Sequence, residues 1–168
     1  TIKIQNYEAF RANMRSVFTL DGGLVRFSQM DLVSDGARTA ITGTVDMARW
    51  PEQLYHLRSE IDFPTQKEIF FHGQNFKTAG RGTFQGTFHL FSGGRELKGA
   101  FTSPLAGVIV GGRHWQFPNL RGSVLWVPDR LEITDATSRL YGGAAKFDYR
   151  LAPIGKKVYG IVNYHNAV

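Results

Sequence analysis

Apolar and polar residues alternate along most of the chain. In the segment 55–63, every second residue is Tyr, Leu, Ser, Ile or Phe, and His, Arg, Glu and Asp stand between them. A period of two is typical of a β-strand with one apolar and one solvated face. The same alternation returns at 37–47, 84–90, 97–101 and 145–151. The pattern therefore predicts an antiparallel sheet with one apolar face.

Short turn motifs separate the alternating segments. Asp21-Gly22-Gly23, Ser92-Gly93-Gly94 and Val127-Pro128-Asp129-Arg130 each stand between two apolar runs, as in β-hairpins. The stretch 120–151 reads as three strands joined by tight turns. Counting all such segments, we expect about ten or eleven short strands.

One short helix is predicted within this series of strands. Thr65-Gln66-Lys67-Glu68 has the form of a capping box, with Thr65 at the N-cap and Glu68 three residues later. Gly73 is a suitable C-terminal stop. We expect a helix over 66–72 that lays Ile69 and Phe70 onto the sheet or across its end.

Glycine recurs inside the predicted strands, in motifs such as Gly-Thr-Phe at 82–84 and 86–88. Glycine within a strand often marks a bend or a bulge. We therefore predict an all-β fold with one short helix, in which a long antiparallel sheet is strongly curved. It is either groove-like or closes toward a barrel or sandwich. Residues 1–168 form a single β-groove segment, which we expect to be an excerpt of a longer, repetitive β-sheet protein.

Charge and cysteine content narrow the function classes. The 20 Lys and Arg residues outnumber the 14 Asp and Glu residues, giving a net charge of +6. The basic residues are scattered rather than gathered into a stripe, so we expect no nucleic-acid partner. Weak attraction to an anionic membrane surface stays open. The absence of cysteine removes disulfides, thiolate metal sites and cysteine nucleophiles.

No catalytic constellation stands out. None of the five histidines pairs with another at metal-ligand spacing. The glycine-rich segment 107–112 lacks the Lys-Ser/Thr of a phosphate loop, and no Gly-x-Ser-x-Gly motif occurs. The aspartates at 46, 62, 129 and 135 lie in or beside predicted turns, where Asp is common for backbone reasons. We expect no enzyme activity, no cofactor and no metal.

The predicted apolar face is the remaining candidate for function. It is either the core of a closed sandwich or the lining of an open groove that takes acyl chains, since each buried CH₂ gains about 0.8 kcal/mol without directional demand. The residues expected to line it are Tyr55, Leu57, Ile61, Phe63, Phe84, Phe88, Leu90, Leu97, Phe101, Phe117, Val124, Trp126, Leu131, Ile133, Phe147, Tyr149 and Leu151.

Three segments resemble the TamB/AsmA-like translocation and assembly proteins of bacteria. They are GTVDMARWPEQLYHLRSEIDFPTQKEIFF at 43–71, GTFQGTFHLFSGGRELKGAFTSPLAGV at 82–108 and LRGSVLWVPDRLEITDATSRLYGGAAKFDYRLAP at 120–153. The resemblance covers most of the chain from Ser16 to Pro153. The resemblance implies no catalytic residues. The functional surface of the family is the lining of its groove, and only the alternating apolar positions named above correspond to it in this sequence.

The resemblance implies a phospholipid or other acyl-chain ligand and a periplasmic location. It further implies that a parent protein is anchored in the inner membrane by a segment not included here. That parent would dock to an outer-membrane assembly partner, and would support lipid transport from the inner to the outer membrane and outer-membrane biogenesis.

Two other functions are compatible with the residues. The first is a carbohydrate-binding or adhesin-like β-sandwich that uses Trp50, Trp115 and Trp126 as stacking platforms. The second is a purely structural β spacer whose apolar face is a closed core.

Overall fold

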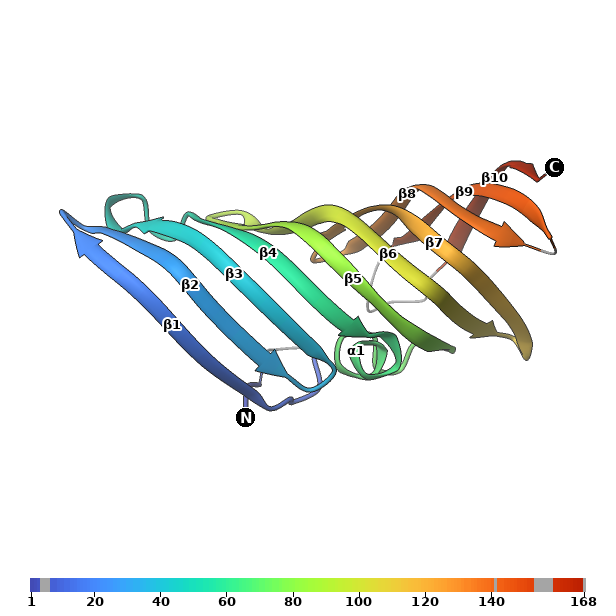
Figure 1. The fold of residues 1–168 in the computed structure, drawn as a ribbon, viewed down its shortest axis with the longest axis horizontal. Coiled ribbons are helices and arrows are strands. Elements are labelled where there is room, and N and C mark those ends of the chain that lie inside the picture. Colours follow the sequence, from blue (N-terminus) through green and yellow to red (C-terminus); the bar gives the residue numbers. More distant parts are fainter. Residues whose placement is uncertain (4–6, 141, 153–158, 168) are drawn as a thin grey trace.

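The computed structural model shows one antiparallel sheet whose ten strands are ordered as they occur in the sequence (Figure 1). The structure describes residues 1–3, 7–140, 142–152 and 159–167. The strands are β1 (Ala12–Asp21), β2 (Leu24–Ser34), β3 (Ala37–Asp46), β4 (Gln53–Asp62), β5 (Phe76–Phe91), β6 (Gly94–Val110), β7 (Arg113–Val127), β8 (Arg130–Leu140), β9 (Gly143–Ala152) and β10 (Tyr159–Ala167). The 3₁₀ helix Met47–Arg49 and the α-helix α1 (Phe63–Phe70) interrupt the series. The all-β class, the antiparallel pairing and the single short α-helix are thereby confirmed.

The sheet is open, which corrects part of the expected shape. Every strand pairs only with its neighbours in sequence, so β1 and β10 lie at opposite ends of the sheet (Figure 1). The sheet closes into neither a barrel nor a sandwich, and it is twisted rather than strongly curled. A meander of hairpins adds each new strand to the same growing edge, so nothing brings the two edges together.

Most of the predicted hairpin turns are where the glycine and proline signals place them. β1 and β2 are joined at Gly22-Gly23, and both glycines have positive φ, of 54° and 87°. The turn at Pro128-Asp129 joins β7 to β8, with Val127 paired to Arg130. Local turn chemistry thus fixes the register of these hairpins.

The glycines within strands do more than bend the sheet, because aromatic rings lie against them. A Cβ on Gly86 would stand 2.6 Å from the Phe84 ring, and one on Gly99 would stand 2.8 Å from that same ring. A Cβ on Gly82 would likewise meet the Phe63 ring at 2.5 Å. The recurrent glycine-aromatic motif therefore lets rings lie flat on one face of the sheet, an arrangement that supports strand pairing. This accounts for many glycines without strong curvature.

The helix begins earlier than the sequence pattern predicted. Asp62 is the N-cap, its carboxylate accepts hydrogen bonds from the Thr65 backbone N–H and side-chain hydroxyl, and Pro64 occupies the first turn. The assignment of Thr65 as N-cap was therefore wrong, because Asp-Phe-Pro is a stronger helix start than the capping box that follows it. Phe63 consequently starts α1 instead of extending β4.

Replacing Asp62 tests this helix cap. The Thr65 hydroxyl bond is the main cause that lowers the pKa of the Asp62 carboxyl, and the Thr65 backbone N–H and Arg81 lower it further. Because the pKa of Asp62 is lower in the folded than in the unfolded protein, the ionised carboxylate stabilises the folded state at pH values above the unfolded pKa of 3.8. This stabilisation is lost as the pH falls through the folded-state pKa. Asp62→Ala should lower the free energy of unfolding by about 1 kcal/mol at pH 7.

The measurement is chemical denaturation of Asp62→Ala and Asp62→Asn at pH 7 and at pH 3. Asparagine is itself a good N-cap, so Asp62→Asn should cost less than the alanine variant. The difference between wild type and Asp62→Ala should shrink at pH 3. An equal loss at both pH values would show that the carboxylate does not cap α1.

The close packing around Gly86 makes a second prediction. A Cβ on Gly86 would lie 2.1 Å from the Lys98 carbonyl oxygen, so Gly86→Ala should lower the free energy of unfolding by about 1–3 kcal/mol through overpacking. Gly93 is the matched control, because its nearest neighbour would be the Phe91 ring at 3.4 Å. Urea denaturation of both alanine variants checks this, and equal effects would refute the steric explanation.

Candidate functional site

All seventeen predicted lining residues lie on one side of the sheet, here called the inner face. Each is buried or half-buried, whereas His56, Arg58, Glu60 and Gln85, which lie between them on β4 and β5, are exposed. The helix α1 lies on the inner face, with the Phe63 ring against Gly82. The strand register thus agrees with the period of two in the sequence, while the assignment of these residues as the lining of a lipid groove stays a prediction.

The strand register arranges the inner-face residues into three rows that cross the sheet from strand to strand. The first row is Phe18, Phe27, Gly43, Tyr55, Phe88, Leu97, Trp126, Leu131 and Leu151. The second row is Met30, Ile41, Leu57, Gly86, Gly99, Val124, Ile133 and Tyr149. The third row contains Leu32, Thr39, Ser59, Phe84, Phe101 and Gly122, followed by Ala136 and Phe147. The rows form a continuous, largely apolar surface along the sheet.

This surface is only partly covered. Phe84, Phe147 and Leu151 are 5%, 8% and 4% exposed, yet no large side chain among the described residues is fully buried. At the β1 end, Phe18 and Leu20 are 56% and 68% exposed. A sheet without a facing sheet leaves apolar area in contact with water, which a globular core would have removed.

An aromatic cluster, formed by Tyr7, Phe10, Phe70, Phe71 and Trp126, covers part of the inner face. The Trp126 ring lies 5.3 Å from Phe70, 5.6 Å from Phe71 and 6.3 Å from Tyr7. Phe70 also contacts Tyr7 and Phe10, at 5.2 and 6.1 Å. The cluster therefore joins α1 and the N-terminal segment to β7.

Of this cluster, the sequence predicted Trp126 on the apolar face and Phe70 on the sheet or across its end. It did not connect the N-terminal segment with Tyr7 and Phe10 to α1. A hydrogen bond from the Glu8 backbone N–H to the Ile69 carbonyl, 3.1 Å long, provides that connection. Phe10 packs beside Phe70 of α1, whereas Met14 already lies in β1.

The strands bend around α1. Phe71 contacts both Phe76, at the start of β5, and Trp126, which is level with Phe88 near the end of β5. Phe71 thus contacts the beginning of β5 and the end of β7. This local bend places the helix across the apolar rows.

Two tyrosines report the environment of the inner face. Burial raises the pKa of the Tyr55 phenol and of the Tyr149 phenol above the usual value of 10.0. Desolvation disfavours the phenolate, so both rings lie at a weakly polar surface. The Tyr55 hydroxyl donates to Gln53 Oε1 at 2.6 Å, which keeps its polar end satisfied. By contrast, the buried Trp126 indole Nε1 has no hydrogen-bond partner among the described residues.

An open cavity of about 460 Å³ lies between α1 and the N-terminal segment. Glu8, Asp35, Glu68 and His72 contribute its charged groups, and the His72 ring lies 3.8 Å from Glu8 and 3.7 Å from Glu68. No group of three or more potential metal ligands gathers anywhere in the described part of the chain. We therefore assign these contacts to holding the N-terminal segment against α1.

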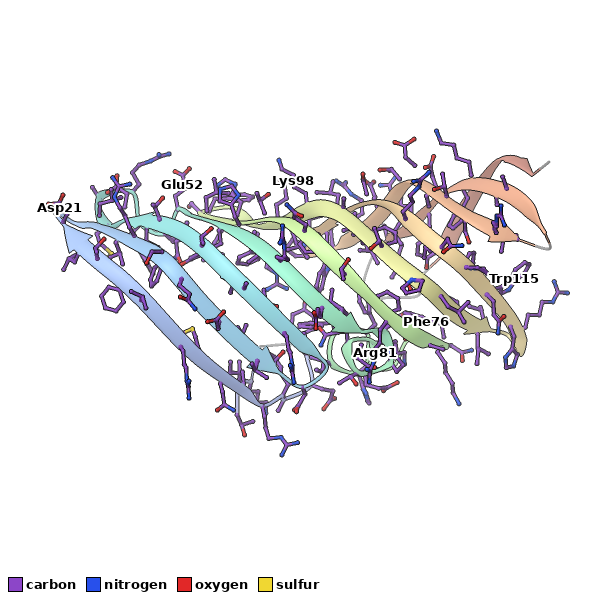
Figure 2. The ribbon with its side chains drawn as sticks, viewed as in Figure 1. Asp21, Glu52, Phe76, Arg81, Lys98 and Trp115 are labelled. Atoms are coloured by element: carbon purple, nitrogen blue, oxygen red, sulfur yellow. The ribbon has the colours of Figure 1, made fainter. Side chains whose placement is uncertain are left out.

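The three tryptophans do not form a shared stacking platform. Trp50 follows the 3₁₀ helix between β3 and β4 and is 61% exposed, whereas Trp126 is packed against aromatic rings. Trp115 lies in the first residues of β7, at the opposite end of that strand from Trp126 (Figure 2). This separation removes the geometric basis of a three-tryptophan sugar site.

Comparison with known proteins adds no family. No protein-family model, curated protein or solved structure matches the chain. Among the described residues, no helix has the length and apolar character needed to cross a membrane. The inner face is therefore the main structural feature from which a function can be inferred.

The aromatic cluster makes a prediction about stability. Trp126→Ala should lower the free energy of unfolding by about 2 kcal/mol, because a half-buried indole leaves its ring contacts. Trp50→Ala should change it by less than about 0.5 kcal/mol, since Trp50 is an exposed residue. Chemical denaturation of both variants provides the measurement, and similar losses would contradict the role of the cluster.

Proposed function

We propose that this chain is a β-sheet segment whose inner face binds the acyl chains of phospholipids, as part of a longer lipid-conducting protein. The observation that carries the proposal is the alignment of the apolar rows across successive strands of an open sheet. Such rows offer a continuous path with no directional bonding demand, which suits movement of an acyl chain along the sheet.

The partial exposure of the inner face supports the same function. Phe18 and Leu20 leave the β1 end of the surface open to solvent. Each CH₂ group of a lipid tail that covers such a surface gains about 0.8 kcal/mol. An occupant without a fixed shape, such as an acyl chain, fits an open surface of this kind.

Polar groups on the inner face favour an amphipathic ligand. The unpartnered Trp126 indole N–H is a donor that an ester carbonyl or a carboxylate would satisfy. Arg95 donates to the Tyr7 hydroxyl and lies 5.2 Å from the Tyr7 ring, close to the same cluster. A lipid head region near Trp126 would thus find both a donor and a cation, while its tails follow the rows.

The biological setting in this proposal comes from the resemblance to TamB/AsmA-like proteins. The segment would be a trough-like part of a periplasmic conduit between the inner and outer membranes. The membrane anchor and the region that docks to an outer-membrane assembly partner would belong to the parent protein. In this setting α1 and residues 7–10 would cover one section of the trough.

A structural spacer is the second candidate. Its specific support is the aromatic cluster, which already covers part of the inner face with protein. The spacer requires the apolar face to be a sealed core, whereas the described residues include no facing sheet and leave Phe18 more than half exposed. The open surface therefore favours the lipid-binding role.

Charge substitutions on the two faces of one strand distinguish these functions. Leu57→Glu places a carboxylate on the second apolar row, and His56→Glu places one on the exposed face beside it. Leu57→Glu should reduce uptake of a fluorescent fatty acid at least about tenfold while the sheet stays folded, because a charge would be desolvated by the bound chain. His56→Glu should bind as wild type does.

Circular dichroism and denaturation provide the folding control. Unfolding of Leu57→Glu would indicate a sealed core and support the spacer. Wild-type protein that neither takes up the fatty acid nor carries phospholipid in native mass spectrometry would overturn the lipid-binding function.

A further inference from the structure

An open cleft with basic side chains lies on the outer face of the sheet, across β6–β9. Its volume is about 880 Å³. Its lining includes Thr102, Asn119, Arg121, Thr137, Arg139 and Lys146. The apolar rows do not account for this cleft, because its charged side chains point away from them.

The strand register places the polar side chains of the cleft in a row. Thr102 pairs with Arg121, Arg121 with Thr137, and Thr137 with Lys146. Arg139 follows two residues after Thr137 on β8 and therefore points to the same side. The register thus places Arg121, Arg139 and Lys146 on the same face as Thr137 and next to it in the sheet.

Irregular backbone shapes the cleft. Asn119 and Asp135 both have φ of 52°, and the pairing of β8 with β7 and with β9 shifts register beside Asp135. Bulges of this kind re-aim nearby side chains and often accompany binding sites. Here they lie beside the row that contains Arg121, Thr137 and Lys146.

The ionisable residues that line the cleft are basic, and one acidic residue, Asp135, lies at its margin. The Arg121 Nε donates to the Thr137 hydroxyl at 3.0 Å, and Lys146 Nζ lies 2.8 Å from Asp135 at the margin. The Arg139 guanidinium has no acidic partner within the described part of the chain, so its charge is available to a ligand.

We propose that this cleft is a binding site for a phosphate group. The two guanidinium groups of Arg121 and Arg139 provide charge-assisted donors for a tetrahedral oxyanion, and arginine suits phosphate because its fork can donate two hydrogen bonds. The Thr137 hydroxyl, which accepts from Arg121, has its own proton to donate, whereas the Thr102 hydroxyl is hydrogen-bonded to Thr83 and Lys146 is paired with Asp135 at the margin. The volume admits a phosphate that carries an organic substituent as well as inorganic phosphate. The site does not depend on acyl-chain binding, since it lies on the opposite face.

Titration of the folded protein with inorganic phosphate at low ionic strength tests the site, followed by isothermal calorimetry and by ³¹P NMR line width. Wild type should show saturable binding, and Arg121→Gln and Arg139→Gln should each weaken it about tenfold or more. The matched control is Arg58→Gln, an exposed outer-face arginine on β4 that donates to Gln85. It removes the same charge and should leave affinity within about twofold.

A second arm separates free phosphate from a lipid head group. The probes are glycerol 3-phosphate and vesicles of phosphatidylcholine with and without phosphatidic acid. Saturable binding to either soluble phosphate, lost in both cleft variants, would support a site for soluble phosphates. Binding to phosphatidic acid vesicles alone, again lost in both cleft variants, would support a lipid phosphate.

Two results would overturn the proposal. The first is the absence of saturable binding to every probe. The second is binding that falls equally in Arg58→Gln and in the cleft variants, because general attraction to the positive net charge would then explain it. Thermal denaturation of each variant without ligand confirms that the compared proteins are folded.

Discussion

The structure depends on one constraint: a sheet ten strands wide has an apolar face, and the described part of the chain contains no second sheet to cover it. The hydrogen-bond ladders hold each strand to its neighbours and align the inner-face residues into rows. The ladders satisfy the backbone but do not remove the apolar side chains from water. Everything else on the inner face can be understood as a response to this remaining area, because burial of apolar surface is the dominant favourable contribution to folding.

The chain covers part of that area itself. The Asp62 cap and Pro64 start a helix at the end of β4, and this helix places Phe70 and Phe71 against Trp126. Glycines in β5 and β6 let the Phe84 and Phe63 rings lie against the backbone, so that these rings cover part of the inner face. The area that remains, above all toward β1, is what the proposed acyl ligand would cover. In this account the apolar rows of the inner face bind acyl chains, and the cleft with basic side chains on the outer face binds phosphate.

The sequence predicted the local features of this fold well. Alternation in β4 identified which side chains share a face, and the Gly22-Gly23 and Pro128-Asp129 signals identified hairpins, because both depend on neighbouring residues alone. The predictions of closure and of strong curvature were wrong, because the overall shape of a sheet depends on the relative twist of all ten strands and not on any local pattern. The predicted start of the helix was wrong because Asp62, followed by Pro64, is the N-cap in place of Thr65. The contact between α1 and the N-terminal segment could not be predicted, because Tyr7 and Trp126 are 119 residues apart and no local pattern links them. The outer cleft was likewise hidden, since Arg121, Arg139 and Lys146 come together only through the register of β7, β8 and β9.

The central claim is that lipid tails lie along the inner face, and position-resolved crosslinking tests it most directly. A photoreactive phenylalanine analogue would replace Phe88 on the first apolar row, and in a separate protein Gln85 on the exposed face of the same strand. After irradiation of protein purified from phospholipid-containing cells, mass spectrometry of the intact chain should show a phospholipid adduct at position 88. Position 85 should show little or none. Equal adducts at the two positions, or no adduct at position 88 in a folded protein, would contradict the account.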